Sequence, residues 1–492
     1  MVGDYFVSSV YDLHYQLNCN TRHDTCFYIT IRESSAAIHI WKYSGKSSVS
    51  QRFLPLSFHP ISSGWVDEKI YLLSESALYS LNLCSDCLSA LPLPESKIVD
   101  ILSLSIEGDY LYVSMIDPDW IDFYRKSEAQ TDVKLASYHI FARKLNFSGC
   151  PVSSAEQNHI EKYIVDYQMV AEEGICDSYD GHELKIVRTS LYSELYSDGI
   201  CLKRIFGCID RAFYFGDTVI YSSSSLASPT EIQCFASDDS IVDRASDVSA
   251  DLDHISVSYC SEACLPVYHY RLGGSFPGKG FIFMLHGGPA GRYSNRFDPM
   301  AYAFAEAGFT VFLVNYPGST GYGQEYQTCL YGKAGTEDCR AVTDCLSRLA
   351  EKYKEIPTYL VGDSYGGYLA ILISLKSENA VQKTYAVNAF TDIRHQFLFS
   401  RARHIIAKYF PDIRSLETQA VNPIDLTQNG QLKDRLLIIN GSNDSYCPKE
   451  QIVQFANLSK CDVVFLPDYP HYMVDYLKTN QISQVILRDI GE

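Results

Sequence analysis

The sequence predicts two regions of different fold class: an all-β region over residues 1–255 and an α/β region over residues 256–492. In the first region short apolar or alternating runs recur between Ser, Gly, Asp and Pro clusters, and long amphipathic helices are scarce. After residue 255, apolar strand-like runs alternate with helical runs. That alternation is typical of a mostly parallel sheet covered by helices on both faces.

The N-terminal strands are expected at a spacing that suggests blades of roughly 40–50 residues, about five of them, in a reduced β-propeller-like domain. No Trp-Asp or kelch signature repeats, so a β-sandwich is the competing interpretation. The expected strands are residues 27–31, 37–43, 69–73, 77–83, 109–115, 137–145, 213–221 and 231–235.

In the second region the expected strands are residues 281–285, 309–315, 358–361, 383–388, 436–440 and 463–466. The expected helices are 301–307, 338–353, 368–376, 449–458 and 474–489. No long insertion is expected between these strands. Ligands of such sheets bind at the carboxyl ends of the strands, so the loops that follow the strands are where a site is sought.

Composition narrows the class of protein. The 492 residues are 46% hydrophobic and 20% charged, as in a globular protein, and long enough for two or three domains. The net charge of −18, from 59 acidic and 41 basic side chains, disfavours nucleic acid or an anionic membrane as partner. We interpret this excess of acidic side chains as a feature that keeps the protein soluble.

The sequence predicts a cytoplasmic protein. Residues 1–15 lack the basic start and long apolar run of a secretory signal, and no apolar run is long enough to span a membrane. The 16 cysteines are then expected as free thiols. Cys84 and Cys87 form one Cys-x-x-Cys pair, but Cys260 and Cys264 do not supply a second pair at zinc spacing, so no metal is predicted.

Residues 362–368 (Gly-Asp-Ser-Tyr-Gly-Gly-Tyr) follow an apolar strand and precede a helical run. They predict a sharp strand-to-helix turn with Ser364 at its apex. Only glycine leaves room for the neighbouring backbone in such a turn. The hydroxyl is then held at a helix N-terminus, where developing negative charge is stabilised. Ser364 is therefore the candidate nucleophile.

A serine nucleophile needs a base, and the base needs an acid that holds its tautomer. In this type of site the chain order is Ser, Asp or Glu, His. His471 is the only histidine after Asp444, and it lies on a loop past the strand 463–466. Asp444 follows the strand 436–440 and is the candidate acid. Its rivals are Asp425, Asp434, Asp462 and Asp468.

The oxyanion of the reaction needs hydrogen-bond donors. The backbone N–H of Tyr365, directly after the nucleophile, is one candidate. The strand 281–285 runs into His286-Gly287-Gly288-Pro289, whose glycines allow close approach to a substrate carbonyl. Gly288 is therefore the second expected donor.

These motifs resemble the prolyl oligopeptidase family of serine peptidases, particularly its acylaminoacyl-peptidase-like branch. The matching residues are 286–289 (His-Gly-Gly-Pro), 315–323 (Asn-Tyr-Pro-Gly-Ser-Thr-Gly-Tyr-Gly), 362–368, Asn443-Asp444 with Pro448, and His471. The resemblance implies an α/β hydrolase fold behind a β-propeller. It also implies Ser364 as nucleophile, Asp444 as orienter, His471 as general base and a backbone N–H near Gly288 in the oxyanion hole.

The chain departs from the family at two points. Pro317 stands where the family usually has arginine, and the N-terminal half is short for the usual seven-bladed propeller. A reduced propeller leaves open how the enzyme selects substrates by size.

The sequence thus predicts a serine hydrolase that cleaves short peptides or N-blocked aminoacyl groups without a metal or cofactor. The same triad could instead serve an esterase, thioesterase, transacylase or peptide cyclase. A non-catalytic interaction protein is the remaining alternative, against which the intact Ser364, Asp444 and His471 argue. The expected partner is a small peptide or acyl substrate, and a homo-oligomer is possible.

Overall fold

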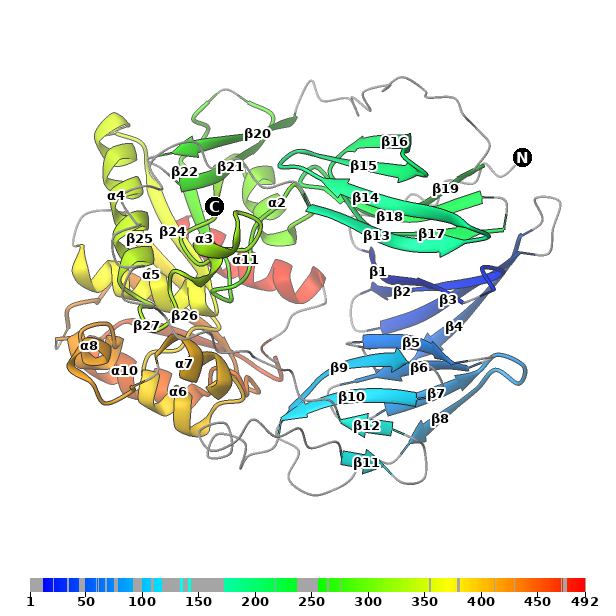
Figure 1. The fold of residues 1–492 in the computed structure, drawn as a ribbon. Coiled ribbons are helices and arrows are strands. Elements are labelled where there is room, and N and C mark those ends of the chain that lie inside the picture. Colours follow the sequence, from blue (N-terminus) through cyan, green and yellow to red (C-terminus); the bar gives the residue numbers. More distant parts are fainter. Residues whose placement is uncertain are drawn as a thin grey trace.

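A computed structural model describes residues 12–32, 35–43, 49–91, 100–116, 133–142, 172–236 and 255–491. Short stretches inside these ranges are excepted: 21, 59, 61, 67–68, 75–77, 108–109, 136–139, 217, 263–264, 275, 354, 378–380, 411, 429, 470 and 472–475. A set of β-sheets from the N-terminal half lies beside a mixed sheet with helices from the C-terminal half (Figure 1).

The described N-terminal residues form five sheets. The first contains β1 (Asp12–Cys19), β2 (Thr25–Arg32), β3 (Ser35–Tyr43) and β4 (Val49–Leu56). The second contains β5 (Ser62–Val66), β6 (Lys69–Leu73), β7 (Leu78–Asn82) and β8 (Cys87–Leu91). The third has the order β11 (Val133–Leu135), β12 (Ile140–Ala142), β10 (Tyr110–Ile116), β9 (Asp100–Glu107). The fourth contains β13 (Glu172–Tyr179), β14 (His182–Arg188), β15 (Tyr192–Ser197) and β16 (Ile200–Phe206). The fifth contains β17 (Cys208–Phe215), β18 (Thr218–Ser225) and β19 (Ser228–Ala236).

These sheets pack through their first strands. β9 contacts β5, β5 contacts β1, β1 contacts β17, and β17 contacts β13, so the fifth sheet packs beside the first. Apolar side chains fill the layers between neighbouring sheets; for example, Leu17 and Tyr28 pack with Phe215 and Ile220. First strands that meet one another are the arrangement of a β-propeller. The predicted all-β, propeller-like region is confirmed.

One predicted strand in this half is wrong. Residues 213–221 are not one strand, because β17 ends at Phe215 and β18 begins at Thr218. Gly216 makes the turn with a φ of 58°, and a Cβ there would lie 2.3 Å from a ring carbon of Tyr43. Aromatic and β-branched residues stand on both sides of the turn, so Gly216-Asp217 was its only sequence signal. The predicted strand 137–145 lies partly outside the described residues, which show β12.

The C-terminal half contains one eight-stranded sheet of order β20-β21-β23-β22-β24-β25-β26-β27. Its strands are β20 (Ile255–Glu262), β21 (Leu265–Leu272), β22 (Phe281–Leu285), β23 (Thr310–Val314), β24 (Thr358–Asp363), β25 (Lys383–Val387), β26 (Leu436–Gly441) and β27 (Asp462–Leu466). β21 pairs antiparallel with both of its neighbours, β20 and β23. The six strands from β22 to β27 run parallel to one another. The parallel strands β22, β23 and β26 are wholly buried, because helices cover both faces of the sheet.

The helices of this half are α2 (Pro299–Glu306), α3 (Gln324–Thr328), α4 (Glu337–Lys352), α5 (Tyr365–Lys376), α6 (Ile393–Phe399), α7 (Arg403–Tyr409), α8 (Leu416–Gln419), α9 (Pro423–Leu426), α10 (Lys449–Ser459) and α11 (Tyr476–Ile490). The four from α6 to α9 lie between β25 and β26, so the expectation of no long insertion between strands is wrong. These helices are only four to seven residues long, so they lack the long amphipathic period by which helices are recognised in a sequence.

Buried polar contacts join the two halves near α2. The Asn295 side chain accepts a hydrogen bond from Leu226 N at 3.1 Å and donates one to Leu191 O at 2.9 Å. Asn295 is 2% exposed. Arg296 forms an ion pair with Asp210 at 2.5 Å. The loop before α2 is therefore held by the N-terminal sheets.

Among the described residues, none of the helices has the length and apolarity required to cross a bilayer. Cys84 and Cys87 are exposed free thiols in the β7–β8 turn. The side chains of Cys260 and Cys264 lie outside what the structure describes.

Candidate active site

Ser364 occupies a strained turn between β24 and α5. Its φ of 53° and ψ of −114° are unusual for a residue with a side chain. The turn depends on close backbone contacts. A Cβ on Gly362 would lie 2.1 Å from Gly366 O, and a Cβ on Gly366 would lie 2.2 Å from Leu285 O. Only glycine fits at both positions, as the sequence predicted.

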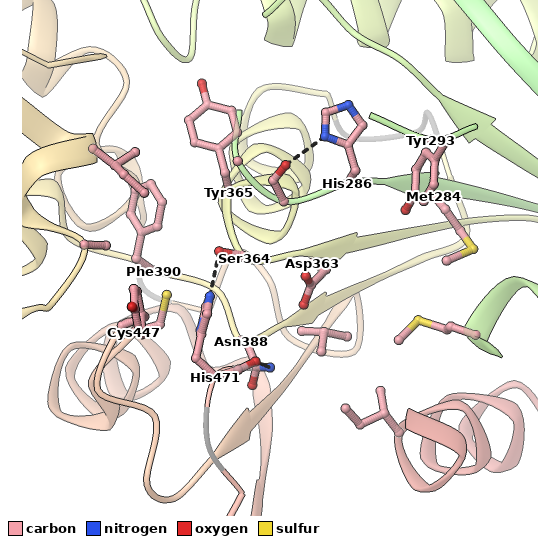
Figure 2. Close-up of a pocket in the computed structure, with 18 of the residues that line it drawn as sticks. Met284, His286, Tyr293, Asp363, Ser364, Tyr365, Asn388, Phe390, Cys447 and His471 are labelled. Atoms are coloured by element: carbon pink, nitrogen blue, oxygen red, sulfur yellow. Dashed lines mark hydrogen bonds between the residues drawn. The ribbon is translucent and has the colours of Figure 1, made fainter. Parts of the chain in front are cut away.

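Three of the predicted site residues come together in a chain of two hydrogen bonds. The Ser364 hydroxyl donates to Nε2 of His471 at 3.0 Å, and Nδ1 of His471 donates to Oδ2 of Asp444 at 2.8 Å (Figure 2 shows the first). Oδ1 of Asp444 accepts from the backbone N–H groups of Tyr446 and Cys447 at 2.8 and 2.7 Å. The carboxylate is thus fixed by its own loop and turns its second oxygen to the imidazole.

Asn388, at the carboxyl end of β25, also positions this group and was missed by the sequence reasoning. Its side chain donates to His471 O at 3.1 Å and accepts from Gly441 N at 3.2 Å. It therefore links the loop of the candidate base to the end of β26, which precedes the candidate acid. Its place at the end of the predicted strand 383–388 was the only available signal.

The rival acids lie elsewhere. Asp425 forms an ion pair with Arg394 at 2.5 Å, and Asp468 is exposed. Asp462 begins β27 and is exposed at the opposite end of that strand from His471. Asp434 is an exposed turn residue with a φ of 61° before β26. Of these carboxylates, Asp444 is the one that contacts the imidazole.

Electrostatics at His471 favour its protonated form. Burial lowers the pKa of its imidazole, but the hydrogen bond and charge of Asp444, with the charge of Asp363, outweigh burial and raise the pKa above the usual value. The imidazolium that a proton transfer from Ser364 would create is therefore stabilised.

A cavity of about 670 Å³ opens beside Ser364. Its lining on one side is apolar and comes largely from the α6–α7 segment and the loop after β26, with Phe390, Ile405, Ile406 and Cys447. On the other side lie Met284, Tyr293, Asp363 and the start of α2. Figure 2 shows Phe390 and Cys447 on the opposite side of Ser364 from Asp363 and Met284. Ser364 thus lies between an apolar part of the cavity and a part that contains Asp363.

The predicted oxyanion donors both line this cavity. Gly288 has a φ of 135°, and a Cβ there would lie 2.6 Å from the backbone nitrogens of Ala290 and Gly291. Buried His286 holds the loop: burial lowers its pKa to about 4, so the ring is neutral. Its Nδ1–H donates to Gly287 O at 2.8 Å, and Nε2 lies 2.7 Å from Oγ of Ser319, whose hydroxyl is also 2.7 Å from Tyr316 O.

The position of Tyr365 is fixed by its buried side chain. Its side chain is 2% exposed, and its hydroxyl donates to Oδ2 of buried Asp338 at 2.6 Å. This contact fixes the first turn of α5, which carries the Tyr365 backbone N–H beside Ser364. The backbone of Tyr365 is thus held at the cavity, while its side chain points away from the cavity.

Donor atoms of Asp444, Cys447 and His471 lie within 4.8 Å of one another, the one potential metal cluster among the described residues. Asp444 and His471 already direct these donors at each other. The cluster is therefore accounted for by the hydrogen bonds of the candidate active site.

Comparison with known proteins identifies a family domain in the C-terminal half of the chain. Residues 295–466, which include Ser364 and Asp444, match the sequence model of the prolyl oligopeptidase family (Peptidase_S9). The chain carries a prolyl oligopeptidase family domain. The resemblance predicted from the sequence is confirmed.

Relatives of this prolyl oligopeptidase family domain include the acylamino-acid-releasing enzyme of Mus musculus, 27% identical over 190 residues, or 36% of this chain and 26% of that protein. A Bacillus subtilis (strain 168) protein named "Uncharacterized peptidase YuxL" is 27% identical over 191 residues, or 36% of this chain and 28% of that protein. The aligned segments span about a quarter of the length of these relatives.

Solved structures share the fold over nearly the whole chain. An acylaminoacyl peptidase of Pyrococcus horikoshii has a TM-score of 0.62 at 13% identity, covering 96% of this chain and 93% of that one. An acylaminoacyl peptidase in complex with Z-Gly-Gly-Phe-chloromethyl ketone has a TM-score of 0.56 at 12% identity, covering 98% and 96%. These likenesses confirm an α/β hydrolase fold preceded by an all-β region.

Proposed function

We propose that this protein is a serine peptidase in which Ser364 is the nucleophile, His471 the general base and Asp444 the residue that orients the base. The observation that carries the proposal is the unbroken chain of hydrogen bonds, 3.0 Å from Ser364 Oγ to His471 Nε2 and 2.8 Å from His471 Nδ1 to Asp444 Oδ2. Nucleophile, base and orienter at hydrogen-bond distance are what acyl transfer through serine requires.

The reaction follows from this geometry. Ser364 Oγ attacks the substrate carbonyl while its proton passes to Nε2 of His471. The backbone N–H groups of Tyr365 and Gly288 stabilise the oxyanion of the tetrahedral intermediate. His471 then gives the proton to the leaving amine, which leaves an acyl-enzyme on Ser364. Water activated by the same imidazole hydrolyses the acyl-enzyme and restores the site.

The proposed substrates are short peptides or N-blocked aminoacyl groups. Two observations support this class. The relatives include proteins named acylamino-acid-releasing enzyme, and the cavity of about 670 Å³ has the size of a small-molecule pocket. In this proposal residues 256–492 form the catalytic domain, and residues 1–255 form a separate β-domain that limits access to it. Cytoplasmic location and homo-oligomer formation stay predictions from the sequence.

The test is labelling by a fluorophosphonate probe together with turnover of a chromogenic panel of aminoacyl, N-acetyl-aminoacyl and simple ester substrates. We expect the wild-type chain to be labelled and Ser364→Ala to be unlabelled, with turnover lowered by about 10⁴-fold or more. Normal labelling of the Ser364→Ala variant would overturn the assignment of the nucleophile. Turnover of the simple esters alone would contradict the proposed peptidase activity.

A further inference from the structure

Asp363 precedes the candidate nucleophile and is not used by the proposed reaction. It is the last residue of β24, and its side chain lines the cavity on the side away from Phe390 (Figure 2). The side chain is solvent-accessible because it borders the cavity, although protein surrounds it closely. A carboxylate thus faces the space in which a substrate would bind.

The carboxylate lies close to the reacting groups. The position that a Cβ on Gly287 would take is 3.3 Å from Ser364 Cβ and 3.4 Å from Oδ2 of Asp363. Gly287 immediately precedes the expected oxyanion donor Gly288. The nucleophile, the oxyanion loop and the carboxylate therefore meet around one point at the cavity wall.

The negative charge at Asp363 has little compensation from the described residues. Of the described residues that line the cavity, none is lysine or arginine. The other carboxylate in the lining, Asp298, caps α2 and accepts from the N–H groups of Met300 and Ala301 at 3.0 and 2.8 Å. No hydrogen bond to the Asp363 carboxylate comes from any described residue.

The apolar lining of the cavity makes the negative charge of Asp363 energetically unfavourable when no substrate is bound. Met284, Met300, Val387 and Ile482 contribute apolar surface to the same cavity. Burial, with the charges of Asp444 and Asp298, raises the pKa of Asp363 to about 6 despite the opposing effect of His471. An unpaired carboxylate in such a place gains most from a cationic partner.

We propose that Asp363 is a specificity-determining residue that binds a positively charged ammonium group of the substrate beside the scissile carbonyl. This inference rests on the proposed function, because it assigns the substrate class of the same site. The ammonium can be a free α-amine, two bonds from the carbonyl carbon, or the side-chain amine of a lysine.

The same charge disfavours neutral substrates. A bare carboxylate near the oxyanion loop repels the negative charge that develops on the carbonyl oxygen. A bound ammonium group cancels this repulsion and adds its own attraction. Removing the charge of Asp363 should therefore weaken catalysis with cationic substrates and improve it with neutral ones.

The test compares three p-nitroanilides with related side chains. N-acetyl-norleucine is neutral, norleucine has a free α-amine in place of the acetylated one, and N-acetyl-lysine keeps the acetyl group and carries a side-chain amine. We expect wild-type kcat/KM to be about 10-fold to 100-fold higher for one of the two cationic substrates than for the neutral one. Asp363→Asn should abolish that advantage and raise kcat/KM for N-acetyl-norleucine. Which cationic substrate is favoured identifies the source of the ammonium group.

Asp298→Asn is the matched control. It removes the other carboxylate in the lining, and asparagine caps a helix about as well as aspartate. Its charge preference should match the wild type. An equal loss of preference in Asp298→Asn would overturn the assignment to Asp363, as would an Asp363→Asn variant that slows all three substrates equally.

The two proposals fail in different ways. Turnover of all three substrates by the wild type without a charge preference would overturn the role of Asp363 and leave the peptidase intact. No turnover of any of them, with no fluorophosphonate labelling of Ser364, would overturn the proposed function itself. Complete labelling of Asp363→Asn by the fluorophosphonate, at whatever rate, would show that its fold and nucleophile are preserved.

Discussion

Nδ1 of His471 lies 2.8 Å from Oδ2 of Asp444, which joins the loops that follow the neighbouring parallel strands β26 and β27. Neither loop carries the nucleophile, which follows β24. Three loops at one edge of the sheet therefore have to be in register for the hydrogen-bond chain to form. Asn388, after β25, bridges the gap between them.

Replacing Asp444 should impair catalysis without unfolding the chain. In Asp444→Asn the imidazole loses the partner that fixes its tautomer, and we expect kcat to fall by about 10⁴-fold. Asp468→Asn is the control, because Asp468 is exposed and lies in the same region of the chain. Steady-state kinetics on one N-acetyl-aminoacyl substrate would decide. A greater loss in Asp468→Asn than in Asp444→Asn would mean that the wrong acid has been assigned.

The pH dependence should report the charges around His471. The base acts when neutral, so kcat/KM should rise with pH as His471 loses its proton. The raised pKa of His471 places this rise above the ordinary histidine value of about 6.5. Asp363→Asn removes one of the charges that favour the imidazolium, so the rise should move to lower pH. A profile of kcat/KM against pH with N-acetyl-norleucine p-nitroanilide checks the direction, and a shift to higher pH would contradict it.

Gly366 should not tolerate even the smallest side chain. A Cβ there would meet Leu285 O at 2.2 Å, so Gly366→Ala has to displace backbone at the turn. We expect the free energy of unfolding to fall by about 2 kcal/mol or more. Gly174→Ala, where nothing lies within 4 Å of the added carbon, should be close to neutral. Denaturant unfolding of both variants is the measurement. Equal stability would show that the turn relaxes freely.

Access to the site should be restricted to small substrates. The α6–α7 segment lines the cavity, and the loop that leads into α2 is held against the N-terminal sheets. We expect a susceptible sequence to be cleaved as a free short peptide and to survive as an exposed loop of a folded carrier protein. Mass spectrometry of both digests gives the answer. Equal rates of cleavage would show that neither segment acts as a filter.

The sequence predicted those parts of the site that depend on local chain geometry. The turn at Ser364 could be recognised because glycines at fixed offsets leave the backbone no other arrangement. Chain order and strand ends then pointed to Asp444 and His471. Asn388 could not be found in this way, because its role depends on contacts with residues more than fifty positions away.

Other features depended on tertiary context. Asp363 stands inside the motif of the nucleophile, yet only the cavity shows which way its side chain points and that no described residue neutralises it. The helices between β25 and β26 escaped prediction because they are short and irregular. The turn at Gly216 was missed because strand-forming residues stand directly on both sides of it.

The buried side-chain amide of Asn295 affects how the protein unfolds. It satisfies a carbonyl and an N–H of the N-terminal sheets while it sits in the loop that leads into Phe297 and the cavity wall. A chain that began at residue 255 would leave this amide and the apolar surface around it without partners, at a cost comparable to losing two buried hydrogen bonds. The two halves should therefore melt in one calorimetric transition, and the C-terminal half alone should be a poor unit for expression.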